Sequence, residues 1–235
     1  MKYSLTAICL TLVLSLGTIS SAWSADYLKG LDAYTAGDYS TALHEWTPLA
    51  TQGNADAQYN LGVMYRNGYG VPQNDTTAVK WYTLSAEQGD ARAQFNLGQM
   101  YREGRGVPQD YDTAMKWYTL AAEQGNASAQ FNLGNMYWGG RGVPQDYKTA
   151  RKWYTLVAEQ GDAIAQFNLG LMYAMGKGVF VDYVQAHMWW SIAASSGKKN
   201  AIAYRDKVAG MMTPSQLEKA EVRALVCVRN KYKNC

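Results

Sequence analysis

Three glycine-rich segments have the composition of loops that bind phosphate. They read GYGVPQND from Gly68, and GRGVPQDY from both Gly104 and Gly140. A phosphate loop of the Walker type needs a lysine followed by serine or threonine where its helix begins. Asp110 stands at that place in the second segment, and its carboxylate would repel phosphate. The three segments are therefore predicted to be turns between helices and not nucleotide sites.

A serine–lysine pair is a second candidate for chemistry. Ser195 and Lys198 have the Ser-x-x-Lys spacing of the nucleophile in penicillin-recognising enzymes. A chain with this content of serine and lysine is expected to contain such a match by chance, and this one falls where a helix is expected to end. No catalytic residue is predicted, so the chain is expected not to be an enzyme. A hydrolase of the cell wall or of β-lactams, or a regulator of peptidoglycan-handling enzymes, is the alternative.

Histidine and cysteine are too sparse to predict a metal site. His44 and His187 lie far apart in the sequence, so neither a metal nor another cofactor is expected. Cys227 and Cys235 remain if the N-terminal segment is removed, and an oxidising compartment would favour a disulfide between them. Two free thiols are the alternative.

The first 25 residues are typical of an export signal. Lys2 precedes the apolar run Leu5–Leu16, and small residues follow this run. Cleavage fits best after Ser24 and next best after Ala22. The chain is therefore expected to be periplasmic or secreted from a bacterium, with no stable membrane span after cleavage. An uncleaved membrane anchor is the less favoured alternative.

Charge is distributed unevenly along the chain. The whole chain has 22 Lys and Arg against 19 Asp and Glu, a net of +3, so nothing in the overall balance indicates a nucleic-acid partner. Residues 198–235 alone carry nine basic against three acidic residues. This segment either faces solvent or contacts an anionic surface, and the solvated face is the expected case.

A repeat of 36 residues organises most of the sequence. The segment that begins at Asp90 and the segment that begins at Asn126 agree at 28 of 36 positions. A glycine series and a tryptophan series recur at the same interval: Gly62, Gly98, Gly134 and Gly170; Trp81, Trp117, Trp153 and Trp189. A fixed period of this length indicates stacked supersecondary units, none of which can bury its apolar face alone.

Each repeat is predicted to contain two helices. The first begins after an N-cap residue, which is Asn54, Asp90, Asn126 or Asp162, and has a glycine at its middle. Because glycine costs about 1 kcal/mol in a helix relative to alanine, this glycine predicts the close approach of a second helix. The second helix has an apolar stripe at helical spacing, in which the tryptophan is expected to be core: Ala78, Trp81, Tyr82, Ser85 and Ala86.

The pattern resembles the Sel-1-like repeat family, which is related to the tetratricopeptide repeat. The matching skeleton is seen in Ala93, Gln94, Leu97, Gly98, Tyr101, Gly104, Gly106, Val107, Pro108, Asp110, Ala114, Trp117, Tyr118, Ala121, Ala122 and Gly125. The resemblance implies an all-α fold, a right-handed α-solenoid of helix–turn–helix repeats with helical caps, whose first helices line a concave face. In the fourth repeat Phe180 replaces the proline and Val181 the glutamine, so its turn is expected to pack against the C-terminal tail.

The expected domain organisation follows from the extent of this resemblance. It is strong over four repeats and weaker over a tetratricopeptide-like segment before them. The tail resembles the closing helices of such arrays, with Thr213 as N-cap, Pro214 at the first helical position and Gln216 completing a capping box. The segments are a signal peptide at 1–25, a degenerate repeat at 26–53, repeats at 54–89, 90–125, 126–161 and 162–197, and capping helices with a basic tail at 198–235.

Candidate binding residues lie on one side of the first helices. The positions that vary between repeats fall there: Asp56/Arg92/Ser128/Ile164, Val63/Gln99/Asn135/Leu171, Arg66/Arg102/Trp138/Ala174 and Asn67/Glu103/Gly139/Met175. An asparagine recurs among them in every repeat, and its amide can both donate to and accept from a peptide backbone. The predicted partner-binding residues are Asn60, Asn96, Asn132, Asn168, Arg66, Arg102 and Trp138. The alternative is that the asparagines are solvated or hydrogen-bonded locally.

The same side becomes apolar towards the C-terminus. Trp138, Ile164, Leu171 and Met175 form either a binding patch or a surface that the tail helices cover, and covering is the expected case. The resemblance implies a non-enzymatic scaffold that presents its concave face to a protein or peptide partner.

Overall fold

The computed structural model describes residues 27–233 and residue 235. The predicted export signal lies outside the described residues. Within the described part of the chain every regular element is a helix and no strand is present. The chain divides into two compact units, residues 1–109 and residues 110–235, which are described separately.

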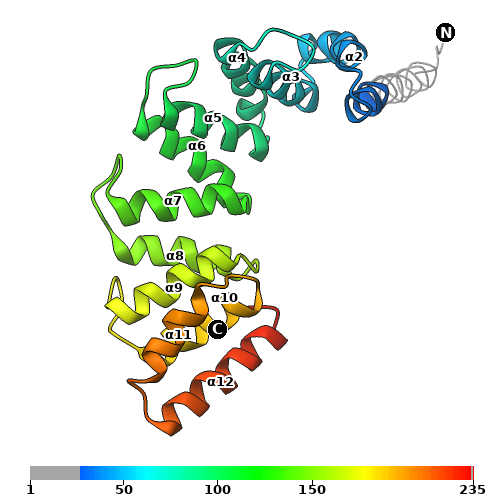
Figure 1. The fold of residues 1–235 in the computed structure, drawn as a ribbon. Coiled ribbons are helices and arrows are strands. Elements are labelled where there is room, and N and C mark those ends of the chain that lie inside the picture. Colours follow the sequence, from blue (N-terminus) through cyan, green and yellow to red (C-terminus); the bar gives the residue numbers. More distant parts are fainter. Residues whose placement is uncertain (1–26, 234) are drawn as a thin grey trace, which may run out of the picture. The chain divides into compact units, whose positions relative to one another are not determined.

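The first unit consists of paired helices joined by short turns (Figure 1). Residues 27–35 are helical and are followed by α2 (Tyr39–Thr51). The first repeat consists of α3 (Ala55–Asn67) and α4 (Asp75–Glu87), and the second repeat begins with α5 (Ala91–Glu103). Trp46 of α2 and Leu61 and Met64 of α3 share one apolar core, so the leading helices join the first repeat.

The second unit continues the alternation and ends in two further helices (Figure 1). Its repeat helices are α6 (Tyr111–Glu123), α7 (Ala127–Gly139), α8 (Tyr147–Ala158), α9 (Ala163–Met175) and α10 (Tyr183–Ser195). The closing helices are α11 (Ala201–Ala209) and α12 (Pro214–Arg229), and both pack against α10.

The predicted helix starts are confirmed. The side chains of Asn54, Asp90, Asn126 and Asp162 each accept a hydrogen bond from a backbone N–H in the first turn of the helix that follows. The glycine-rich segments are turns, as predicted: Gly104 has a φ of +67°, a conformation that costs other residues about 1–2 kcal/mol. Asp110 then caps α6 through the N–H groups of Asp112 and Thr113.

The mid-helix glycines allow an aromatic ring to lie directly on the helix backbone. A Cβ atom on Gly62 would lie 2.6 Å from the ring of Tyr82, and one on Gly134 would lie 2.6 Å from the ring of Tyr154. Atoms cannot approach so closely, so only glycine fits. Gly170 makes the same approach to Trp190, and Gly30 to Trp46. The close approach that the glycine series predicts is therefore confirmed in these helix pairs.

The assignment of the tryptophan series to the core is partly wrong. Trp81, Trp117 and Trp153 are only half-buried, whereas the tyrosine that follows each of them, Tyr82, Tyr118 or Tyr154, is fully or almost fully buried. The tyrosine is the residue that faces the glycine, so it takes the central position. Trp189 is buried because it lies in one cluster with Ala224 and Cys227 of α12.

A buried glutamine links each repeat to the helix before it. Its Nε2 donates to a carbonyl oxygen eight residues earlier, near the end of that helix, where the carbonyl lacks a partner within the helix. The distances are 2.9 Å for Gln58 to Ala50, 3.1 Å for Gln94 to Ala86, 2.9 Å for Gln130 to Ala122 and 3.3 Å for Gln166 to Ala158. The glutamine of the repeat pattern therefore fixes each repeat to the helix that precedes it.

The C-terminal helix is fixed at both ends. At its start Thr213 and Gln216 form the predicted capping box, with each side chain accepting from the other's backbone N–H. At its end the structure pairs Cys227 with Cys235 in a disulfide. Lys233 then lies 3.5 Å from Glu159, which follows α8, so the tail is tied to the third repeat.

The tail does not lie where the sequence predicts. Phe180 is 95% exposed, so the turn of the fourth repeat does not pack against the tail. Ile164 and Met175 also remain nearly half exposed, so the expected covering of this apolar side is wrong for those two residues. The physical reason is that α12 buries its small residues Ala220, Ala224 and Cys227 and packs against α10 instead.

Candidate functional site

The four candidate asparagines do not all present their side-chain amides to a partner in the same way. Asn60 Nδ2 donates to the hydroxyl of Tyr27 at 3.1 Å, and Asn96 Oδ1 accepts from Arg66 at 3.2 Å. Asn132 Nδ2 donates to the backbone carbonyl of Ser128 at 2.9 Å. Only the Asn168 side chain makes no hydrogen bond within the described residues. Three of the four amides therefore have partners within the chain, and Asn168 is the one that offers its whole amide.

The two candidate arginines are also held within the chain. Arg66 Nη1 donates to Asn96 and its Nη2 to Gln99 Oε1 at 3.1 Å, so the guanidinium joins α3 to α5. Burial raises the pKa of Tyr82, and the positive charge of Arg66 opposes this rise in part. Arg102 pairs with its neighbour Glu103. These arginines strengthen contacts within the first unit.

A pocket of about 210 Å³ lies between α7, α8 and α9 in the second unit. It brings together two of the predicted residues, Trp138 and Asn168, and is also lined by Asn135, Tyr154 and Leu171. The ring of Trp138 meets that of Tyr147 edge to face, with 4.9 Å between centroids, which holds the indole in place. The pocket therefore combines apolar walls with two side-chain amides.

The polar edge of this pocket is preorganised by one hydrogen bond. The Tyr154 hydroxyl donates to Asn135 Oδ1 at 2.8 Å. Burial raises the pKa of Tyr154 above its ordinary value, which favours the protonated, donating form further. Asn135 thereby keeps its Nδ2 group directed to other acceptors. The variable positions on the first helix identified Asn135 and Leu171. Tyr154 is the equivalent of Tyr82 in the predicted apolar stripe, and the sequence does not show that its hydroxyl lines a pocket.

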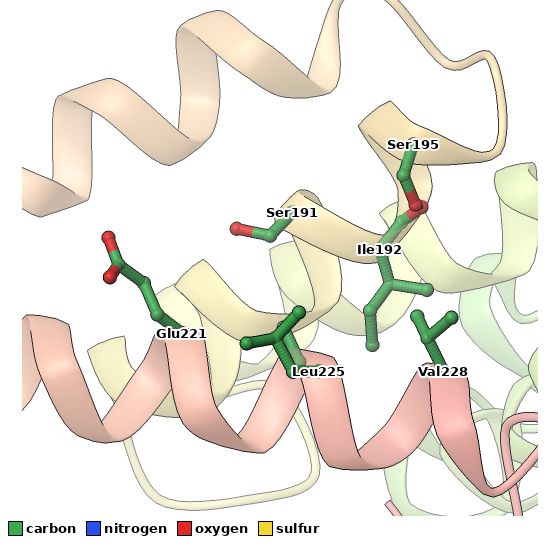
Figure 2. A pocket seen from close by; sticks show the side chains of 7 residues that line it. Ser191, Ile192, Ser195, Glu221, Leu225 and Val228 are labelled. Carbon is green, nitrogen blue, oxygen red and sulfur yellow. The ribbon is translucent and has the colours of Figure 1, made fainter.

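A second and larger pocket of about 470 Å³ lies between α10 and α12 (Figure 2). Its lining is Ser191, Ile192, Ser195, Glu221, Ala224, Leu225 and Val228. Sequence reasoning missed this pocket, since its two walls come from separate segments. The signal that was present is the width of the apolar face of α12, where Val222, Leu225, Val226 and Val228 all remain exposed.

The serine–lysine pair has no catalytic arrangement in this pocket. The Ser195 hydroxyl donates to the carbonyl of Ile192 at 2.8 Å. The Lys198 ammonium lies 5.7 Å from the ring centroid of Phe167, an attraction between a cation and an aromatic face. Neither group activates the other.

The described residues also show neither a metal-binding cluster nor a membrane-spanning helix. No group of three or more His, Cys, Asp or Glu side chains in residues 27–233 and 235 is arranged to hold a metal ion. Of the helices in that part of the chain, none is both long enough and apolar enough to cross a bilayer.

Comparison with known proteins identifies the repeats. The Sel1 repeat family matches residues 55–90, 91–126, 127–162 and 163–198. No curated protein matches the chain. A solved Sel1 repeat protein from Oxalobacter formigenes is 36% identical, with a TM-score of 0.74 over 89% of this chain and 85% of that one.

A second solved structure is that of c5321, a protective antigen present in uropathogenic Escherichia coli strains that displays an SLR fold. It is 35% identical with a TM-score of 0.79, and the match covers 91% of this chain. The chain spans only 46% of the length of c5321. Because four matched repeats occupy more than half of the sequence and a solved relative is 36% identical over most of it, the chain belongs to the Sel1 repeat family.

Proposed function

We propose that this chain is an exported, non-catalytic scaffold that binds a peptide segment of a partner protein on the face formed by α7 and α9. Sel1 repeat proteins generally mediate protein–protein interactions. The observation that carries the proposal is the pocket between α7, α8 and α9, where Trp138 and Leu171 offer apolar contact beside the amides of Asn135 and Asn168. Such a pocket suits one apolar side chain of a peptide, with the amides bonding the backbone on either side of it.

Selection of peptides from a random phage-displayed library against the full chain tests this proposal. Selected peptides are expected to bind at least about tenfold more weakly to Trp138→Ala and Leu171→Ala, because each change removes an apolar wall worth roughly 1.5–3 kcal/mol when fully buried. Asn168→Ala is expected to weaken binding by a smaller factor, as the loss of one hydrogen bond does. Isothermal titration calorimetry measures all three.

Leu156→Ala is the matched control for the peptide experiment. Leu156 lies on α8, as Tyr154 does, but it is exposed and does not line the pocket. Binding to this variant is expected to equal binding to the unchanged chain. Peptides whose affinity ignores Trp138 and Leu171, or a selection that yields no binder, would contradict the proposed site.

Export to the periplasm or the exterior is the second part of the proposal. The pattern of residues 1–25 supports it, and a disulfide between Cys227 and Cys235 suits an oxidising compartment. Mass spectrometry of the chain isolated from the envelope or medium without reductant is expected to find an N-terminus at Ala25 or Trp23 and a peptide linked through both cysteines. An intact Met1 together with free thiols would show that the chain stays inside the cell.

A further inference from the structure

Helix α12 exposes an apolar face opposite the face that it buries. The buried face carries Ala220, Ala224 and Cys227. On the opposite face Val222 and Leu225 are 53% and 69% exposed. Figure 1 shows α12 at the end of the second unit, where its outer face is open to a partner. Aliphatic side chains that gather on one exposed helix face are typical of an interaction surface.

Residues of opposite charge stand at the two ends of this face. Glu218 lies four residues before Val222, and Arg229 lies four residues after Leu225. Both charged side chains are exposed, and neither forms an ion pair within the residues that the structure describes. Spacings of four, three and four residues keep all these positions on one side of a helix. The α12 stripe is defined by Glu218, Val222, Leu225 and Arg229.

The α12 stripe is complementary to a second copy of itself. Positions 218 and 229 have the same midpoint as positions 222 and 225, between residues 223 and 224. Antiparallel packing of two α12 helices about a twofold axis at this midpoint places Glu218 of each copy opposite Arg229 of the other. The same alignment places Val222 opposite Leu225. The alignment that pairs the charges is therefore also the one that buries the aliphatic side chains.

We propose that two copies of this chain associate through antiparallel packing of their α12 stripes. Parallel packing would set Glu218 against Glu218 and Arg229 against Arg229, so like charges would repel. Val226 is 47% exposed beside the stripe and adds to the apolar contact. No residue of α12 lines the pocket between α7, α8 and α9, so this association is separate from the proposed peptide site.

Sedimentation velocity of the full, disulfide-bonded chain tests the proposal. A contact between two helices is at the small end of specific interfaces, so the association is expected to be weak and reversible. When the concentration is raised from about 1 to about 200 μM, the chain is expected to shift from monomer towards dimer. Leu225→Asp is expected to weaken dimerisation by at least about tenfold, because the twofold axis brings two carboxylates into the apolar centre of the contact.

Charge reversal tests the antiparallel alignment. Glu218→Lys and Arg229→Glu are each expected to weaken dimerisation by about three- to tenfold, since each turns two attractive pairs into two repulsive ones. The chain that carries both substitutions is expected to dimerise as the unchanged chain does, because both attractive pairs return with their signs exchanged. Parallel packing predicts no such recovery, since like charges would still face each other.

Leu84→Asp is the control substitution. Leu84 is also an exposed leucine on a helix surface, but it lies on α4 of the first unit. Its replacement is expected to leave dimerisation unchanged. Circular dichroism melting curves of all variants check that each remains folded, so a loss of dimer is not a loss of structure.

Three results would overturn the proposal. They are a chain that stays monomeric over the whole concentration range, a dimer that Leu225→Asp leaves intact, and a double charge variant that does not recover dimerisation. Each is distinct from failure of the peptide site, because that site is tested by Trp138→Ala and Leu171→Ala, which lie outside α12.

Discussion

Replacement of Tyr154 by alanine is expected to lower the free energy of unfolding by about 3–5 kcal/mol, since it empties a buried aromatic site. The ring lies against Gly134 and packs near Phe131, with 5.7 Å between ring centroids, and its hydroxyl bonds Asn135. None of these neighbours can move into the space without disturbing α7. A urea titration followed by helical circular dichroism measures the change.

Two further substitutions separate the contributions at this position. Tyr154→Phe keeps the ring and removes the hydroxyl, so a loss of about 1 kcal/mol is expected. Trp153→Ala removes a larger but half-buried side chain from the same helix, and a loss of about 1–2 kcal/mol is expected. If Trp153→Ala destabilised the chain more than Tyr154→Ala, the tryptophan and not the tyrosine would be the central core residue.

Addition of one methyl group at Gly134 is expected to destabilise the chain by about 1–3 kcal/mol, because it overpacks the interface with Tyr154. The new Cβ of Gly134→Ala would lie 2.6 Å from Tyr154 Cε1, and the buried ring cannot move away. The clash outweighs the gain of about 1 kcal/mol that alanine brings to a helix interior. The same urea titration measures the difference.

Gly139→Ala is the matched control on the same helix. The nearest atom to a Cβ at this position is Arg141 Cγ at 3.7 Å, an ordinary contact. The substitution is expected to leave stability unchanged or to raise it by up to about 1 kcal/mol. Equal stability of the two alanine variants would mean that the packing of the Tyr154 ring does not require glycine at position 134.

The repeat architecture was predictable because its signals are local and recur. A cap residue, a mid-helix glycine and an apolar stripe each recur every 36 positions, and each depends on contacts with residues nearby in the sequence. The choice between Trp153 and Tyr154 was harder, because both lie on the apolar stripe at adjacent helical positions. Only the direction of approach of α7 decides which ring meets Gly134.

The candidate sites were predictable only in part, because they depend on packing between separate segments. Variation between repeats pointed to Trp138 and Leu171, which line one pocket, but it also pointed to Arg66, which is engaged within the chain. The pocket between α10 and α12 depends on the angle at which the last helix packs, and no sequence period encodes that angle. Phe180 shows the same limit, since its apolar character did not bury it.

The two kinds of contact that build the core have a short reach along the chain. The glycine–tyrosine contact, as between Gly134 and Tyr154, lies within one repeat. The glutamine hydrogen bond, as from Gln130 to Ala122, reaches only the preceding repeat. Genetic recombination that adds or removes one whole repeat therefore leaves every remaining repeat with the contacts it requires. The array can thus lengthen or shorten during evolution in steps of 36 residues, and the 28 identities between residues 90–125 and 126–161 are what a duplication of this kind would leave.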